Sequence, residues 1–458
     1  MSPQSFQNFY FKGFKFDYEN LKAEFFYSFD DEVNFTETID FFCDKFQAKE
    51  NLDPDIIDNL LFHLSIAIGI SYYKLYPTKK LIIESGNLDK DQINFWEKFY
   101  INGLGEFFFK NQISPKGLIN FQFGKNKNKH KLFKINLNRA IVPIGGGKDS
   151  LVTIELLRKT GISFDTFTFG KNYTLHKIVG KKFGGHRLII KRQIDPQLFD
   201  MNKQGYYNGH VPITGIISFV LSVASYLYDY KYIIFSNEKS ANEGNTEIDG
   251  VQINHQRSKS LDFETDFNQY LSKYISPDLK YFSLLRGMYE IKIAEMFCNY
   301  KQYFGLFSSC NTNFKILEDR LLKGNFDNAK RCCVCPKCVF VYTIMRPFLD
   351  KKETKLIFGK ELFEDAKLLP LFQQLLGIEG IKPFDCVGTN EEVILAMWKS
   401  YKNFIKETKS KSELPFILQV FENEVLPHLK ESEFTKLENK LLKIYNENNI
   451  PIIINAKF

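Results

Sequence analysis

The sequence predicts an α/β protein, in which a parallel sheet is preceded by an α+β region and followed by a helical region. From residue 139 onward, short apolar runs alternate with helical patterns, which is typical of a parallel sheet covered by helices on both faces. Before that point, residues 9–16 alternate aromatic and polar side chains as a strand does. After residue 350 the chain is rich in amphipathic helical patterns. We therefore expect three regions, 1–135, 136–350 and 351–458.

The composition is that of a globular protein of ordinary solubility. Of the 458 residues, 44% are hydrophobic and 25% are charged, which excludes a largely disordered chain and a coiled-coil rod. A chain of this length buries a core without disulfide or metal staples. The formal charge of +7 fits an anionic small substrate and is weak evidence for nucleic acid, so no nucleic-acid partner is expected.

The N-terminal stretch has no continuous apolar segment and no small-residue cleavage site, so we expect a cytoplasmic protein without a signal peptide. The longest apolar stretch, residues 211–228, contains three serines and leads directly into a strand-like run at 232–235. We interpret it as a buried helix, and we expect no membrane span. The sequence leaves the oligomeric state open.

The expected elements follow in chain order. A strand at 9–16 precedes helices around 56–76 and 90–100, and the basic stretch 124–131 reads as a surface loop. Apolar runs then predict the strands of the parallel sheet at 140–144, 162–169, 187–190, 232–235 and 303–307. Helices at 391–406 and 433–446 are expected near the end of the chain.

A glycine triplet follows the first strand of the predicted sheet. The residues are Gly145, Gly146, Gly147, Lys148, Asp149 and Ser150, and a helix is expected to begin near Asp149. Glycines let the backbone approach an anion closely, and the N–H groups of the first helical turn then point at it. Lys148 and Ser150 add direct contacts, and Asp149 is suited to cap the helix or to help hold Mg²⁺. The alternative is a purely structural glycine turn.

This stretch is not a Walker A loop, because the glycine spacing and the residue after lysine are both wrong. It resembles the SGGxDS signature of the PP-loop ATP pyrophosphatases, with Gly145 in place of the usual serine. That resemblance implies cleavage of ATP between the α and β phosphates and transfer of AMP to an acceptor oxygen. It also places adenine and ribose near Phe169, although core packing explains that side chain equally well.

Five of the eight cysteines lie between residues 310 and 338. Cys332, Cys335 and Cys338 have the spacing of a zinc knuckle, and Cys310 supplies a fourth thiolate, which makes a tetrahedral structural Zn²⁺ site. The cluster resembles the zinc site of 7-cyano-7-deazaguanine synthase, another PP-loop enzyme, although the gap after Cys310 is longer here. Cys333 is a possible substitute ligand, and redox-active or unliganded thiols are the alternatives.

Four polar segments are expected on loops near the glycine triplet. They are residues 206–212, 236–244, 254–260 and 382–389. Ser236 and Glu238 directly follow a predicted strand, and in an open α/β sheet ligands bind beyond the carboxyl ends of the strands. Caps and turns would explain each segment alone, but together they predict the wall of an active site beside bound ATP.

Taken together, these segments resemble one family, the UDP-N-acetyl-α-D-muramoyl-L-alanyl-L-glutamate epimerases (MurL). The resemblance rests on Gly145-Gly-Gly-Lys-Asp-Ser150, Asn208-Gly-His-Val-Pro212, Ser236-Asn-Glu-Lys-Ser-Ala241, Asn254-His-Gln256, Cys335-Pro-Lys-Cys338, Lys382-Pro-Phe-Asp-Cys-Val-Gly388, Gly103-Leu-Gly-Glu-Phe107 and the stretch 63–76. It covers residues from about 8 to about 400.

The resemblance implies an ATP- and Mg²⁺-dependent inversion of the terminal glutamate of a UDP-linked muramoyl dipeptide, releasing AMP and diphosphate. Inversion needs a base and an acid with pKa values near neutral. His255, His210 and Cys386 are the candidates, with Asp385 in reserve, because histidine and cysteine titrate closest to neutral. Arg257 and Lys259 are candidates for the substrate's carboxylates or phosphates.

Two other classes of function remain open from the sequence. One is another PP-loop adenylating enzyme of nucleobase or tRNA modification, similar to 7-cyano-7-deazaguanine synthase. The other is a non-catalytic module in which zinc and the glycine loop only support a partner interface. The first predicts binding of tRNA or a purine, and the second predicts ATP binding without release of diphosphate.

Overall fold

The computed structural model describes residues 4–122, 131–171, 173–183, 186–248, 250–314, 331–408 and 413–455. Within these residues, nine strands form one sheet in the order β11-β8-β5-β6-β7-β3-β2-β1-β4, and two short strands form a separate hairpin. The strands are β1 Asn8–Asp17, β2 Lys22–Phe29, β3 Val33–Asp40, β4 Lys80–Ile83, β5 Arg139–Pro143, β6 Ser163–Phe169, β7 Arg187–Gln193, β8 Tyr232–Phe235, β9 Thr246–Ile248, β10 Val251–Ile253 and β11 Lys280–Ser283.

The helices occupy both faces of this sheet and the C-terminal end of the molecule. They are α1 Pro54–Tyr73, α2 Lys90–Gly103, α3 Gly105–Lys110, α4 Lys148–Thr160, α5 Thr174–Phe183, α6 Pro196–Lys203, α7 Ile213–Tyr228, α8 Leu261–Tyr274, α9 Glu290–Cys298, α11 Pro336–Met345, α12 Lys351–Phe358, α13 Leu369–Leu376, α14 Asn390–Thr408, α15 Phe416–Glu424, α16 Glu431–Leu441 and α17 Ile452–Asn455. Short 3₁₀ segments are η1 Lys239–Asn242, η2 Arg257–Lys259, η3 Lys301–Tyr303, η4 Asn311–Phe314, η6 Arg346–Phe348, η7 Leu362–Glu364, η8 Ala366–Leu368 and η10 Leu426–His428.

The sheet has a parallel part and an antiparallel part. β11, β8, β5, β6 and β7 pair in parallel, whereas β3 pairs antiparallel with β7 and continues into β2 and β1. This arrangement confirms the predicted α/β class with a large, mostly parallel sheet and a helical C-terminal region. The sheet is continuous from the N-terminal strands into the central ones, and the division into three regions stays a prediction.

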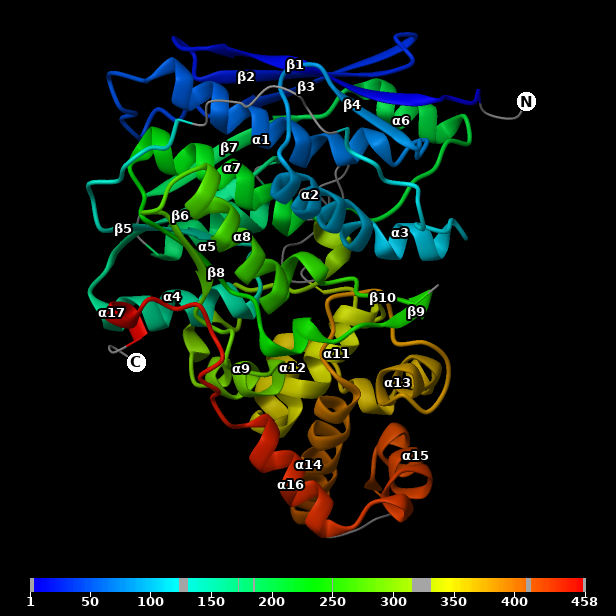
Figure 1. Cartoon of the computed structure of the whole chain (residues 1–458). Helices are drawn as coiled ribbons and strands as arrows, with labels where there is room; N and C mark the ends of the chain where they lie inside the picture. Colours follow the sequence, from blue (N-terminus) through cyan, green and yellow to red (C-terminus); the bar gives the residue numbers. More distant parts are fainter. Residues whose placement is uncertain are drawn as a thin grey trace.

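Two layers of helices bury the two faces of the parallel strands. Side chains alternate along each strand, so Ile141 joins the core beneath α1, α7 and α8, while Val142 joins the core beneath α4, α9 and α11. Figure 1 shows β1–β3 at one end of the molecule and α13–α16 at the other. The parallel strands and the glycine loop therefore lie between the aromatic-rich N-terminal strands and the C-terminal helices.

The order of the parallel strands sets the position of a ligand site. β6 and β7, which follow β5 in the chain, lie on one side of β5 in the sheet, and β8 and β11, which come later, lie on its other side. The direction of winding reverses between β5 and β8, and in open α/β sheets ligands bind at this point, beyond the carboxyl ends of the strands. The residues that follow β5 and β8 are the glycine triplet and Ser236–Glu238.

Two sequence-based predictions differ from the structure. The apolar run 303–307 is not a strand, because Lys301–Tyr303 forms the 3₁₀ segment η3, and the fifth parallel strand is instead β11 at Lys280–Ser283. The aromatic side chains of residues 303–307 are buried in the core beneath neighbouring helices. A short apolar run alone does not show whether such residues form a strand or another buried segment. The helix expected at 433–446 ends at Leu441. Most of the loop expected at 124–131 lies outside the described residues.

Among the described residues, α1 is long and apolar enough to cross a membrane, but 94% of its most apolar window is buried inside the protein. α1 begins at Pro54, where the Asp53 side chain accepts a hydrogen bond from the Asp55 N–H. The shorter apolar helix α7 is buried as well, as the sequence predicts. Both helices belong to the layer that covers the sheet.

Candidate active site

The glycine loop joins β5 to α4 and is shaped by close contacts. Gly146 has a φ of +79°, and a Cβ there would lie 2.5 Å from the Leu175 Cδ2. Its carbonyl accepts a hydrogen bond from the Ser308 N–H at 2.9 Å. Among the described residues no side chain caps α4, because its N-cap residue is Gly147, and the Ser150 hydroxyl donates to the Gly147 carbonyl at 3.0 Å. The loop therefore presents an uncapped helix N-terminus in a fixed backbone conformation.

A buried ionic network lies beneath this loop. The Lys148 ammonium contacts the carboxylates of Asp149 and Glu290, and Lys337 Nζ lies 3.1 Å from the other Glu290 oxygen. Lys148, Glu290 and Lys337 are almost inaccessible to solvent. Burial opposes ionisation of Glu290, but Lys148 and Lys337 lower its pKa to about 2. The network therefore carries fixed charges of both signs next to the loop.

Several polar atoms around the loop are buried without a hydrogen-bond partner among the described residues. They are Ser236 Oγ, Glu238 Oε1 and Ser309 Oγ. Ser309 Oγ would lie 3.4 Å from a Cβ at Gly147, which places it directly beside the loop. Burial raises the pKa of Glu238, and Lys259 opposes this shift. Because orphaned polar groups are costly, these atoms fit a polar ligand such as a nucleotide or a hydrated cation.

A second cluster brings together three of the four predicted acid–base candidates. The His255 Nδ1 contacts the Glu106 carboxylate, and the His210 Nδ1 lies 3.6 Å from the same carboxylate. The two imidazole rings are 4.5 Å apart at their centroids. Lys259 Nζ lies 3.2 Å from the Cys386 Sγ, and His255 interacts electrostatically with that thiol. The structure thus links Cys386, His255, Glu106 and His210 in one row.

The charges in this row set the protonation states of its members. Burial opposes ionisation of Cys386, but Lys259 and then His255 lower its pKa to about 7. Burial likewise opposes protonation of His255, but its interactions with Cys386 and Glu106 raise its pKa to about 9. Between these values the pair exists as thiolate and imidazolium. Burial and the neighbouring His255 lower the pKa of His210 to about 3, so that ring is neutral.

Asp385 is adjacent to the row but faces elsewhere. Its Oδ1 accepts hydrogen bonds from the Asn311 side chain and, at 2.8 Å, from the Cys386 N–H. The carboxylate therefore holds the backbone that carries Cys386, and it connects this backbone to the segment after Cys310. This geometry assigns Asp385 to positioning the thiol.

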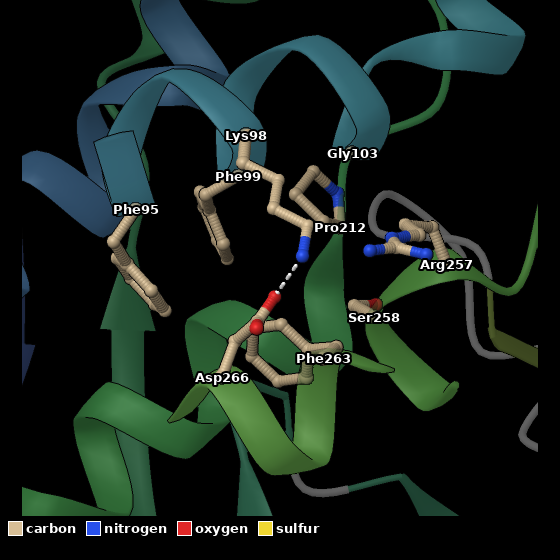
Figure 2. A pocket seen from close by; sticks show the side chains of 9 residues that line it. All are labelled: Phe95, Lys98, Phe99, Gly103, Pro212, Arg257, Ser258, Phe263 and Asp266. Atoms are coloured by element: carbon tan, nitrogen blue, oxygen red, sulfur yellow. Dashed lines mark hydrogen bonds and ion pairs between the residues drawn. The ribbon is translucent and has the colours of Figure 1, made fainter. Parts of the chain in front are cut away.

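Three segments of the chain, one with Gly103 and one with Pro212, bring the row together. Figure 2 shows Gly103, Pro212 and Arg257 close to one another; they lie three residues from Glu106 and two residues from His210 and His255, respectively. A Cβ at Gly103 would lie 2.7 Å from the Pro212 Cγ, so only glycine permits this approach. The pocket drawn there has a volume of only about 20 Å³, room for about one water molecule. This small pocket is therefore a gap where α2, η2 and α8 pack together, and it is too small to bind a substrate.

The four predicted zinc ligands converge. The thiols of Cys310, Cys332, Cys335 and Cys338 all lie within 4.8 Å of one another, and the Cys332 and Cys338 sulfurs are 3.8 Å apart. A tetrahedral Zn²⁺ with bonds of about 2.3 Å has ligand sulfurs about 3.8 Å apart, so this set fits zinc. Cys333 has a φ of 55°, and its Sγ lies 3.5 Å from the Phe358 carbonyl oxygen, away from the other thiols.

The cysteine site adjoins the glycine loop on two sides. Lys337 stands between Cys335 and Cys338 and contacts Glu290, and Ser308 binds Gly146 just before Cys310. A metal ion that fixes the four thiols would therefore also fix two contacts of the loop. We expect its role to be structural.

Phe169 lies at the wall of a large cavity. The cavity has a volume of about 1,320 Å³, and it extends from the carboxyl ends of β6 and β7 to His210. Phe169 is half-buried, and the Arg192 guanidinium lies 5.8 Å from the centre of its ring. The side chain thus faces a space large enough for a base or a sugar, but it also packs against its own sheet.

The sequence did not single out Glu106, Glu290 or Lys337 as site residues. Each is charged and almost fully buried, and each contacts a predicted site residue or its network. Glu106 lies within the Gly103–Phe107 segment of the family resemblance, which was the one available signal. Glu290 and Lys337 are indistinguishable in sequence from helix-surface charges.

Comparison with known proteins gives the same family over most of the chain. Residues 1–284 match the MurL N-terminal domain, and residues 306–431 match the MurL C-terminal domain. A UDP-N-acetyl-alpha-D-muramoyl-L-alanyl-L-glutamate epimerase of Xanthomonas oryzae pv. oryzae is 35% identical over 369 residues, which are 78% of this chain and 80% of that protein. The epimerase of the same name from Salinispora tropica is 32% identical over 403 residues, 85% of this chain and 84% of that protein. These matches confirm the resemblance seen in the sequence, and the chain belongs to the MurL epimerase family.

Proposed function

We propose that the protein is an ATP-dependent epimerase that converts the terminal L-glutamate of UDP-MurNAc-L-Ala-L-Glu to D-glutamate, in the synthesis of a peptidoglycan precursor. The observation that carries the proposal is the row of Cys386, His255, Glu106 and His210 beside the glycine loop. The names of the related epimerases support this substrate and this reaction. The glycine loop supports a fold of the PP-loop ATP pyrophosphatase type.

Activation of the carboxylate explains why ATP is needed. The α-proton of a free carboxylate is a very weak acid, because its removal leaves a dianion. Transfer of AMP from ATP to the α-carboxylate gives a mixed anhydride and releases diphosphate, and the α-proton becomes far more acidic. In this step the N–H groups that begin α4 bind phosphate, and Lys148 and Lys337 offset its charge.

The inversion then needs one proton removed and one proton returned. The Cys386 thiolate takes the α-proton from one face of the α-carbon and becomes a thiol, and the adjacent His255 imidazolium offsets the negative charge that develops on the acyl group. Because His255 lies beside Cys386, the proton on the opposite face is returned by solvent, and the thiol then loses its proton to solvent, which restores the starting pair. Glu106 orients the imidazole, and Lys259 stabilises the thiolate. Hydrolysis of the anhydride releases AMP and D-glutamate.

Two metal ions fit residues around this site. Mg²⁺ bound with ATP would supply charge neutralisation at the phosphates, and Asp149 and Glu238 are the carboxylates near the loop that would hold it. The orphaned Glu238 Oε1 supports this assignment. Zn²⁺ fits the four converging thiols and would hold Lys337 beside Glu290.

The proposal is tested by measuring AMP and diphosphate release from ATP and Mg²⁺, with and without UDP-MurNAc-L-Ala-L-Glu, followed by chiral analysis of the glutamate. We expect release that depends on the dipeptide substrate, together with D-glutamate. Release with tRNA or a deazapurine carboxylic acid, and none with the muramoyl dipeptide, would instead support an enzyme of nucleobase or tRNA modification. The four-cysteine site, which resembles that of 7-cyano-7-deazaguanine synthase, is the observation that favours this second candidate.

A further inference from the structure

The cavity of about 1,320 Å³ is larger than the 300–1,000 Å³ typical of a pocket for one small ligand. His210 lines one part of it, and Phe169 and Lys171 line another. Leu198 and Phe199 of α6 add an apolar wall. The cavity therefore connects the acid–base row with the end of β6 and leaves room for a ligand beyond the reacting groups.

Lys74 is a buried cation in the wall of this cavity, and it has no counter-ion among the described residues. It caps the C-terminus of α1, it is 5% exposed, and its Nζ donates to the Asn208 Oδ1 at 2.8 Å. Within the described part of the chain, no carboxylate lies within 4.0 Å of its ammonium. Burial, and then Arg192, lower the pKa of Lys74 to about 8, and no anion opposes the shift.

Two neighbouring cations of the same cavity are already paired, and a third, Lys171, is exposed to solvent. Arg192 binds both oxygens of Glu37, at 2.7 and 3.1 Å, and also the Ser71 hydroxyl. Lys191 lies 2.9 Å from Asp40 and is 67% exposed. Because a buried unpaired charge is costly in the free protein, Lys74 differs from both in needing a partner from outside the chain.

We propose that Lys74 binds the diphosphate of the UDP-linked substrate and so anchors the nucleotide end of that molecule in the cavity. This inference rests on the proposed function and names the substrate group that the cavity receives. The ATP phosphates have the glycine loop with Lys148, and the carboxylates of the glutamate have Lys259 beside Cys386. A diphosphate is the remaining anion of the substrate, and the apolar wall of α6 suits the base and sugar attached to it.

The structure offers a matched pair of variants to test this. Lys74→Met removes the unpaired buried cation, and Lys191→Met removes a paired, exposed cation of the same cavity. We expect Lys74→Met to raise the KM for UDP-MurNAc-L-Ala-L-Glu about 10- to 100-fold, the usual effect of losing a hydrogen-bonded charge contact, with the KM for ATP unchanged. Lys191→Met should leave both values as in the wild type.

Binding of UDP alone, measured by calorimetry without turnover, separates this inference from the proposed function. Wild-type protein and Lys191→Met should bind UDP, and Lys74→Met and Lys74→Gln should not. If the wild type binds UDP but releases no AMP with the muramoyl dipeptide, the proposed function fails while the anion site stands. Lys74→Gln keeps a hydrogen bond to Asn208 and decides the question if the methionine variant does not fold.

Three outcomes would overturn the inference. The first is equal UDP affinity in wild type and in the Lys74 variants. The second is a rise in the KM for ATP in place of that for the muramoyl substrate, which would assign the contact to ATP. The third is lost affinity for the free dipeptide L-Ala-L-Glu, which would assign it to a carboxylate of the glutamate.

Discussion

The protein has two thiol sites next to its glycine loop, and they differ in what surrounds the sulfur atoms. In the four-cysteine site, each thiol approaches other thiols, with Cys332 and Cys338 3.8 Å apart. At the second site a single thiol, Cys386, lies beside Lys259 and His255. Several thiolates close together need a metal ion to offset their charge, whereas one thiolate beside two cations is stable by itself. The neighbours therefore assign a structural role to the first site and a proton-transfer role to the second.

The proton-transfer role of the second site is tested by removing the thiol of Cys386. We expect Cys386→Ala to lower the rate of epimerisation by about 10³-fold, because general acid–base groups contribute about 10²- to 10⁴-fold. The rate is followed by chiral analysis of the glutamate. Cys298→Ala, at a buried thiol on α9, is the control and should keep the rate within a few-fold of wild type. A Cys386→Ala enzyme with wild-type activity would show that another group removes the proton.

The cysteine site is tested by its effect on stability and metal content. We expect Cys338→Ser to lose bound zinc, measured by elemental analysis, and to lower the free energy of unfolding by about 3 kcal/mol or more. Cys333→Ser is the matched control, because that sulfur faces the Phe358 carbonyl, and it should retain the metal. Equal zinc content in both variants would remove the structural role assigned to the four thiols.

The paired pKa values predict a bell-shaped dependence of activity on pH. The Cys386 thiolate forms as the pH rises through about 7, and the His255 imidazolium is lost as the pH rises through about 9. The rate should therefore be greatest near pH 8, and the two limits belong to the pair. A profile that falls steadily from pH 6 to pH 9 would contradict the thiolate–imidazolium assignment.

The variant Glu106→Gln tests whether the upper limit of the pH profile belongs to His255. Without the carboxylate, the pKa of His255 falls, so the upper limit of the profile should move to lower pH, with a drop in kcat of about 10- to 100-fold. Glu247→Gln, at an acidic residue of the β9–β10 hairpin, is a control that should leave the profile in place. An unchanged upper limit in Glu106→Gln would mean that Glu106 does not act through His255.

The smallest expected effect concerns the glycine loop. Gly146→Ala places a Cβ 2.5 Å from Leu175 at a φ of +79°, so we expect a loss of stability of about 1–3 kcal/mol and a higher KM for ATP. Gly305→Ala is the control, because it lies outside the loop and no heavy atom lies within 4 Å of a Cβ at that position. Equal thermal unfolding and equal KM for both variants would show that the loop conformation is not needed.

How far the sequence predicted the structure depends on how local each feature is. The glycine loop, its strand and its helix, and three of the four cysteines are close in sequence, and spacing alone indicated them. Glu106, Glu290 and Lys337 were missed because their partners come from distant segments; Glu290 lies 142 residues from Lys148. Strand β11 was missed because its four residues carry no distinctive periodicity, and its pairing with β8 is visible only in three dimensions.

The most direct test of the central claim is exchange of the α-proton of the glutamate in D₂O. The account predicts that UDP-MurNAc-L-Ala-L-Glu acquires one deuterium at the glutamate α-carbon only when ATP and Mg²⁺ are present. The product should carry D-glutamate, and Cys386→Ala should show almost no exchange. Exchange at the wild-type rate without ATP would contradict the account, because the proton would then be removed without activation of the carboxylate.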